Sequence, residues 1–175
     1  MVLSTRDKHA VRIIEDITNS LEVKASVQTS KNIIFFEQNV NKIYSVLKNK
    51  KDMVKKIKVD HNMSLHLVGT DKKEVGIEWI SEGEKGILMY SIMYGLVKLS
   101  EQKIPLIVDS PLGKMDSEHV KKIVSFLYPD IGNQIILLSH DREITKDVVP
   151  MLDPIISRKY TLMEKTPKIK EGYFE

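Results

Sequence analysis

The sequence predicts an α/β domain in which parallel strands are flanked by helices. Short, continuous apolar runs at residues 104–108 and 134–138 have the length of strands that are buried on both faces. Segments with helical periodicity alternate with these runs, which is the order expected when helices connect parallel strands. The chain has 175 residues, and 42% of them are hydrophobic, enough for one domain with its own core.

The first 56 residues are expected to be helical, because they contain neither proline nor glycine. Apolar residues recur at helical spacing on both sides of a polar break near residues 28–31. They are Val11, Ile14, Ile17 and Leu21 before the break, and Phe36, Val40, Ile43 and Leu47 after it. The steps of four, three and four residues in the second group fit a coiled coil. An amphipathic helix packed on a domain explains them equally well.

A period of two, typical of strands, begins at Ile57. Alternation is seen before and after the turn-forming sequence GTDKKE, at Met63, Leu65, Leu67, Val75, Ile77 and Trp79. This pattern predicts a β-hairpin whose turn lies near residues 69–74.

Ser81 is predicted to cap the next helix, because Glu84 follows three residues later and completes a capping box. This helix is apolar nearly all round as far as Val97, which predicts that it is buried. The remaining elements are expected in alternating order. They are a strand at 104–108, a helix at 116–128 ended by Pro129, Gly132 and Asn133, a strand at 134–138, a helix from about Asp141, and a last strand at 155–163.

Composition narrows the class of protein. The net charge is only +3, so no nucleic-acid partner is required by charge alone. The basic run KNKKDMVKKIK, residues 48–58, fits either a solvated helix face or a patch facing DNA. The absence of cysteine excludes disulfides and thiolate metal sites. Without a signal peptide or an apolar run of membrane-spanning length, the expectation is a soluble, cytoplasmic protein with no membrane partner.

Three places in the predicted fold suit a nucleotide. Ligands of parallel α/β sheets bind beyond the carboxyl ends of the strands, where Asp109 and then Ser139 and His140 are expected. The helix that begins after Ser81 offers free backbone amides and a positive dipole end to an anion. Each feature is common in proteins without a ligand, and only their order favours a nucleotide site.

That order matches a known superfamily. The stretch ISEGEKGIL, residues 80–88, resembles the signature motif of ABC-type ATPases in the form used by SMC-like DNA-maintenance proteins. PLIVDSPLGKMDSEH, residues 105–119, resembles their Walker B strand and D-loop, and QIILLSHDREI, residues 134–144, resembles the following strand and switch histidine. The likeness extends to the DndD family, the ATPases of bacterial DNA phosphorothioation. It rests there on the string D-S-P-L-G-x-x-D-S-x-H, the Tyr-Pro pair at 128–129, the strand Ile-Leu-Leu-Ser and Gly-Tyr-Phe at 172–174, and spans residues 35–175.

The resemblance implies a P-loop NTPase fold: the C-terminal lobe of an ABC/SMC-type ATPase head at residues 57–175, preceded by the base of a coiled-coil arm at residues 1–56. It implies ATP and Mg²⁺ as cofactors, and a role for each motif. Ser81 and Gly83 would bind the γ-phosphate of ATP held by the opposite protomer, flanked by Glu82, Glu84 and Lys85. Asp109 would hold Mg²⁺ through water, Asp116 in the D-loop would span the dimer interface, and His140 would contact the γ-phosphate.

Two departures from the superfamily pattern affect activity. No G-x-x-x-x-G-K-[ST] motif is present, so the phosphate-binding loop would come from a separate N-terminal lobe, and no independent ATPase activity is expected. Ser110 stands where many relatives carry a catalytic glutamate, although DndD-like sequences have a small hydroxyl residue there. A serine has no basicity near neutral pH, so hydrolysis should be slow unless Glu118 or His119 substitutes as the base.

Three functions remain open from the sequence. The first is the C-terminal half of an SMC-like ATPase that couples ATP binding and head dimerisation to DNA sulfur modification, with the P-loop lobe, a second head, DNA and other DNA-modification proteins as partners. The second is a related ATPase of DNA repair or phage defence. The third is a structural clamp that binds ATP without useful hydrolysis.

Overall fold

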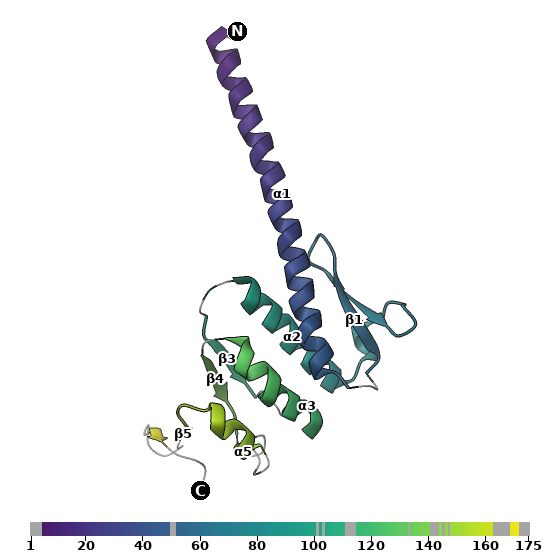
Figure 1. The fold of residues 1–175 in the computed structure, drawn as a ribbon, viewed down its shortest axis with the longest axis vertical. Helices are drawn as coiled ribbons and strands as arrows, with labels where there is room; N and C mark the ends of the chain where they lie inside the picture. The colour runs from purple at the N-terminus through teal and green to yellow at the C-terminus, as the bar shows by residue number, and fades with distance from the viewer. Residues whose placement is uncertain are drawn as a thin grey trace.

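A computed structural model describes residues 5–49, 52–100, 102, 104–110, 115–132, 134–140, 144, 146, 148–162 and 169–171. Its most prominent feature is helix α1 (Thr5–Leu47), whose first half projects away from the rest of the protein (Figure 1). The lower end of α1 lies beside helix α2 (Glu82–Ser100) and strand β1 (Val54–Val59). No helix in the described part of the chain is long and apolar enough to cross a membrane.

The second apolar group of α1 forms part of the core. Phe36, Val40, Ile43 and Leu47 are only 0–4% exposed. Gly95 of α2 allows the two helices to approach closely, because a β-carbon there would lie 2.6 Å from Val40 Cγ2. The amphipathic packing of residues 36–47 predicted from sequence is therefore confirmed.

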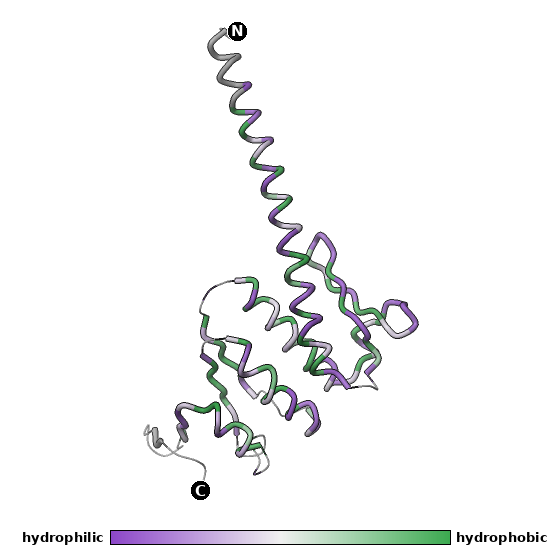
Figure 2. Tube along the Cα trace, in the orientation of Figure 1, coloured by the Kyte–Doolittle hydropathy of each residue, from purple (hydrophilic) through white to green (hydrophobic). Residues whose placement is uncertain are grey.

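In contrast, the described side chains of the first apolar group of α1 are exposed to solvent. Ile14, Ile17 and Leu21 are 54–62% exposed, and the side chain of Val11 lies outside the described residues. Apolar and polar residues alternate along this projecting half (Figure 2). The helix continues through residues 28–31. The polar break thus marks a change in which face is apolar, and the helix itself is unbroken.

The hairpin lies earlier in the chain than the sequence predicts. Strand β1 pairs antiparallel with β2 (Leu65–Gly69), with Ile57 opposite Leu67. Asp60 forms the turn, because its Oδ1 accepts hydrogen bonds from the amides of Asn62 and Ser64, both at 2.8 Å.

The predicted second strand at residues 75–79 is wrong. Glu74, just before that segment, makes an isolated bridge with Val68, and the segment itself contains the 3₁₀ helix η1 (Ile77–Trp79). The expectation that residues 48–56 are helical is also wrong, since α1 ends at Leu47 and β1 begins at Val54. The described residues of the basic run, 48–49 and 52–58, consequently lie on a connection and a strand, and not on a helix face.

Strands β3 (Leu106–Asp109) and β4 (Ile135–Leu138) are parallel and in register, as predicted. The prediction that both faces of these strands are buried is wrong. Three apolar side chains on them are 39–62% exposed: Ile107, Ile136 and Leu138. We call these three residues the open sheet face.

A continuous helical stretch follows β3. It comprises α3 (Ser117–Lys122), the π turn η2 (Ile123–Leu127) and α4 (Tyr128–Ile131), so it passes the predicted end at Tyr128. Pro129 lies in the first turn of α4, directly after the π turn. Val120, Ile123, Val124 and Leu127 are buried on one side, as the sequence predicts.

The C-terminal part is only partly as expected. Residues 141–143, where a helix was predicted to begin, lie outside the described residues, and α5 covers Val149–Leu152. It is followed by the 3₁₀ helix η3 (Asp153–Ile155). The predicted strand at 155–163 is shorter, since β5 spans Tyr160–Leu162 and pairs antiparallel with β6 (Ile169–Glu171).

Candidate functional site

The capping box at the start of α2 forms as predicted. Ser81 Oγ accepts a hydrogen bond from the amide of Glu84 at 3.2 Å, and the Glu84 carboxylate accepts one from the amide of Ser81 at 3.0 Å. Helix α2 is not buried all round, because Met89 and Leu96 are half exposed. The box fixes the first turn of α2, with Gly83 in it, as a rigid element.

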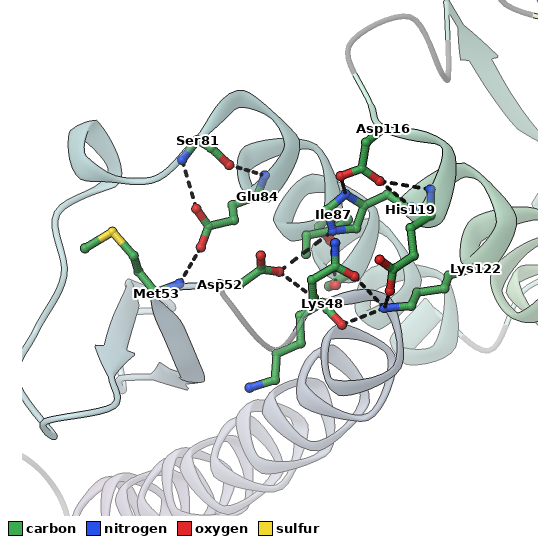
Figure 3. Close-up of polar contacts among 12 residues, drawn as sticks. Lys48, Asp52, Met53, Ser81, Glu84, Ile87, Asp116, His119 and Lys122 are labelled. Atoms are coloured by element: carbon green, nitrogen blue, oxygen red, sulfur yellow. Dashed lines mark hydrogen bonds and ion pairs between the residues drawn. The ribbon is translucent and has the colours of Figure 1, made fainter.

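Glu84 has a further role that the sequence did not reveal. Its second carboxylate oxygen accepts a hydrogen bond from the amide of Met53 at 2.7 Å, and the side chain is buried (Figure 3). This carboxylate therefore ties the start of α2 to the connection after α1. Glu82 and Lys85 lie on the outside of the same turn, where Lys85 Nζ contacts Glu82 Oε1 at 2.8 Å.

Asp116 caps helix α3. Its Oδ1 accepts hydrogen bonds from the amides of Glu118 at 3.0 Å and His119 at 2.9 Å. Its Oδ2 lies 3.0 Å from His119 Nδ1 (Figure 3). The preceding residues 111–114 lie outside the described part of the chain.

A hollow of about 940 Å³ brings the start of α2 and the start of α3 together. It also reaches the end of α1. Its lining comprises Ser45, Val46, Lys48, Asn49, Asp52, Ser81, Gly83, Asp116, Glu118, His119 and Lys122. Ser81 and Gly83 thus share one surface with Asp116, from which they are separated by over 30 residues in sequence.

The hollow is lined by side chains of both charges. Lys122 Nζ contacts the backbone oxygen of Lys48 at 2.9 Å, Asn49 Oδ1 at 2.7 Å and Glu118 Oε1 at 3.2 Å. Burial, with smaller effects of Asp52 and Glu84, raises the pKa of the nearby Tyr44 hydroxyl well above its usual value.

A second group of candidate residues lies at the carboxyl ends of β3 and β4. Asp109 is opposite Leu138 in the register, and the amide of Ser110 donates to Leu138 O at 2.8 Å. Ser110 Oγ lies 3.4 Å from Asp109 Oδ1. Ser139 and His140 directly follow β4, and the side chains of Asp109 and His140 are exposed. Two neighbouring strands thus end with polar groups at the same edge.

Ser110 has an unusual backbone, with a φ of 49°. This left-handed conformation is strained for a residue with a β-carbon and is found often at functional sites. Sequence reasoning singled out Ser110 for its side chain but had no signal for its backbone.

Glu118 and His119 are the residues that the sequence offers as a substitute base for Ser110. The His119 ring is buried and lies between Asp116 and Asp52, with Nε2 3.8 Å from Asp52 Oδ2. Glu118 is exposed and contacts Lys122.

Among known proteins, the chain is similar in fold to several solved structures. No protein-family model matches the sequence, and no curated protein does. Among solved structures, a chain from work on ATP-driven dimerisation and DNA-stimulated activation of SMC ATPases matches with a TM-score of 0.61 and 12% identity, covering 86% of this chain and 89% of that one.

Two further solved structures have a similar fold. The SMC head domain from Thermotoga maritima has a TM-score of 0.54, and an SMC head bound to the C-terminal winged-helix domain of ScpA has 0.59, each with 12% identity. They cover 85% and 82% of this chain, which spans only 52% and 43% of their lengths. The chain therefore has the fold of part of an SMC ATPase head.

Proposed function

We propose that this chain is the C-terminal lobe of an SMC-like ATPase head, which couples ATP binding and head dimerisation to a DNA transaction. One observation carries the proposal: Ser81 and Gly83 at the start of α2 share a surface hollow with Asp116 at the start of α3. The fold of SMC heads supports it independently. The solved neighbours include SMC ATPases that dimerise with ATP and are stimulated by DNA.

The start of α2 suits the γ-phosphate of an ATP molecule held by a second head. Backbone amides of the first helical turn and the positive end of the helix dipole favour an anion there. Glu84 would act indirectly, since its carboxylate is buried and shapes the turn through the amides of Ser81 and Met53. Glu82 and Lys85, which pair with each other on the outer side of the turn, would flank the phosphate.

The carboxyl edge of β3 and β4 suits the magnesium ion of an ATP molecule held by this head. Mg²⁺ prefers oxygen ligands and keeps several waters and phosphate oxygens. Asp109 offers an exposed carboxylate, with the hydroxyl of Ser110 beside it. Among the described residues no group of three or more histidines or carboxylates could hold a metal alone, so the ion would arrive with the nucleotide. His140 would sense its γ-phosphate.

A P-loop lobe would complete the head by covering the open sheet face. Ile107, Ile136 and Leu138 form an apolar surface on β3 and β4, beside the Mg²⁺ edge. The cost of exposing these side chains favours burial against a partner. The exposed apolar residues in the first half of α1 fit the base of a coiled-coil arm, whereas the buried residues 36–47 and strand β1 belong to the lobe.

DNA sulfur modification is the DNA transaction that we propose. It rests on the DndD-like sequence string from Asp109 to His119 and on the matching segments after it. The sulfur chemistry would belong to partner proteins, because this chain has no cysteine. The protein would act in the cytoplasm.

A clamp that binds ATP without turnover is the second candidate, and Ser110 favours it. The side chain of Ser110 has no general base, and its hydroxyl lies 3.4 Å from Asp109 Oδ1. Loss of a general base costs on the order of 10²–10⁴ in rate.

The experiment that tests the proposal combines this chain with a separately expressed P-loop lobe from the same genome. Mg²⁺-dependent ATP hydrolysis and ATP-dependent association are measured for the wild type, Ser81→Arg and Asp109→Asn. Hydrolysis that both variants lose supports an ATPase, whereas ATP-dependent association without turnover supports the clamp. If a folded lobe gives neither, the proposal is wrong.

A further inference from the structure

The imidazole of His119 lies where the first turns of α2 and α3 meet the connection after α1. The side chain is 4% exposed, although it faces two carboxylates. Neither ring nitrogen makes a hydrogen bond of good geometry with the described residues, and both are buried. Buried polar groups are normally fully paired, so a histidine held in this way calls for an explanation.

On one side the ring faces the cap of α3. Nδ1 lies 3.0 Å from Asp116 Oδ2, while Oδ1 of the same carboxylate is occupied by the amides of Glu118 and His119. The Asp116 side chain is 58% exposed. Its carboxylate is thus held in place from within the protein while part of it remains open to the hollow.

The same ring also faces the first turn of α2. A β-carbon on Gly83 would lie 3.7 Å from His119 Nδ1 and 3.8 Å from Cε1, which are ordinary contact distances. The imidazole therefore lies between Gly83 of the α2 turn and the carboxylate of Asp116.

On its other side the ring faces the connection after α1. Nε2 lies 3.8 Å from Asp52 Oδ2, and that oxygen accepts a hydrogen bond from the amide of Asn49 at 2.7 Å (Figure 3). A displacement of the end of α1 would move Asp52 and, through the ring, act on Asp116.

We propose that His119 is a positioning residue of the ATP site: it holds the Asp116 carboxylate beside the Ser81–Gly83 turn and makes that position depend on Asp52 in the connection after α1. This inference rests on the proposed function, because Asp116 and the turn act on ATP only in a head dimer. His119 itself contacts no reacting atom. Its effect is on the geometry of the groups that do.

A histidine that only fills space would give a different mutational pattern. Leucine has a similar bulk but no polar atom, whereas asparagine is smaller and keeps a donor that can reach Asp116. A space-filling role therefore predicts that leucine is the better replacement. A positioning role predicts that asparagine is.

The test uses the chain combined with its P-loop lobe and measures kcat and KM for ATP in the His119→Leu, His119→Asn, Asp52→Asn and Asp52→Asn/His119→Leu variants. Misplacement of a catalytic group by about 1 Å costs up to ~10²-fold in rate. We expect His119→Leu to lower kcat at least about tenfold with little change in KM, and His119→Asn to restore most of it. The double variant should be no slower than His119→Leu. Lys121→Ala, an exposed change on the same helix, serves as the matched control.

A spectroscopic readout separates this inference from the proposed function. The ¹⁵N chemical shifts of the His119 ring are measured with and without Asp52→Asn and Asp116→Asn, in the absence of ATP. Each substitution should shift the ring signals. Unchanged signals, or a kcat that leucine preserves better than asparagine, would overturn the inference while leaving the proposed function intact. If the wild-type chain and the P-loop lobe neither hydrolyse ATP nor associate when ATP is added, while the His119 ring signals still respond to the substitutions, the proposed function is wrong.

Discussion

Glu84 and Met53 are joined by a hydrogen bond of 2.7 Å from the Met53 amide to the Glu84 carboxylate, which also accepts a bond from the amide of Ser81 at 3.0 Å. One buried carboxylate therefore satisfies two backbone donors from segments 28 residues apart (81 minus 53). It holds the first turn of α2 against the connection that follows α1. The candidate site depends on this junction for its shape.

Replacement of Glu84 by alanine should lower the free energy of unfolding by about 2–3 kcal/mol, because it leaves two amides without their acceptor. Urea denaturation followed by circular dichroism measures this change. Glu82→Ala is the matched control, since Glu82 is on the same turn but its side chain is 63% exposed, and it should cost less than about 0.5 kcal/mol. Equal losses in the two variants would refute the structural role of Glu84.

Replacement of Gly95 by alanine should destabilise the protein, although alanine is normally the better helix former. A β-carbon at position 95 would lie 2.6 Å from Val40 Cγ2 and 2.8 Å from Phe36 Cε2, so α1 and α2 must move apart. Overpacking of this kind costs about 1–3 kcal/mol.

Gly83→Ala provides the comparison, since a β-carbon there meets its neighbours at 3.7 Å or more. That variant should be as stable as the wild type or slightly more so. Thermal unfolding of both variants measures the difference. A Gly95→Ala protein that melts no lower than Gly83→Ala would contradict the close packing of α1 on α2.

Asp130 gives a pH-dependent contribution to stability. The hydroxyl of Tyr94 donates to its carboxylate at 2.5 Å, and this bond, followed by that from Lys98, holds the pKa of Asp130 below its usual value of 3.8. The folded state therefore favours the ionised form. The resulting stabilisation is fully present above about pH 4 and is lost as the pH falls through the lowered pKa.

Asp130→Asn should consequently be less stable than the wild type at pH 6, by about 1 kcal/mol because the side chain is half exposed. The difference should shrink when urea denaturation is repeated below pH 4. A difference that stays constant with pH would mean that the charge of Asp130 plays no part.

The open sheet face should be needed for association with the P-loop lobe and not for the fold of this chain. Ile107→Lys should weaken the affinity for the lobe at least about tenfold, because burying an isoleucine contributes about 1.5–3 kcal/mol. Calorimetric titration measures it. Ile155→Lys, the same change at another exposed isoleucine, is the control. Equal affinities would show that the lobe docks elsewhere.

Local signals in the sequence were sufficient for much of the fold. The capping box at Ser81 and Glu84 needs only two residues at the right spacing, and the parallel strands follow from short apolar runs separated by a helix. The buried seam of Phe36, Val40, Ile43 and Leu47 is likewise a single helical stripe.

Turn chemistry and tertiary contacts account for the elements that were mispredicted. The hairpin was misplaced because its turn depends on Asp60 bonding to amides two and four residues later, while GTDKKE resembles a turn more strongly. Whether a partner covers the faces of β3 and β4 cannot be predicted from their apolar runs, because such a run has the same sequence in either case. The junction through Met53, Asp52 and His119 depends on tertiary contacts for which the sequence has no periodic signal.

The single tryptophan of the chain offers the most direct test of the central claim, that the start of α2 forms an ATP site across a head–head interface. Trp79 lies two residues before Ser81 and is 71% exposed, and Ile80 between them is buried. Its fluorescence, and the quenching of that fluorescence by acrylamide, are measured in the chain combined with a tryptophan-free P-loop lobe. Addition of ATP and Mg²⁺ should shift the emission to shorter wavelength and protect it from the quencher, and Ser81→Arg should abolish both effects. Association driven by ATP that leaves Trp79 equally open to acrylamide, or a Ser81→Arg protein that responds like the wild type, would contradict the claim.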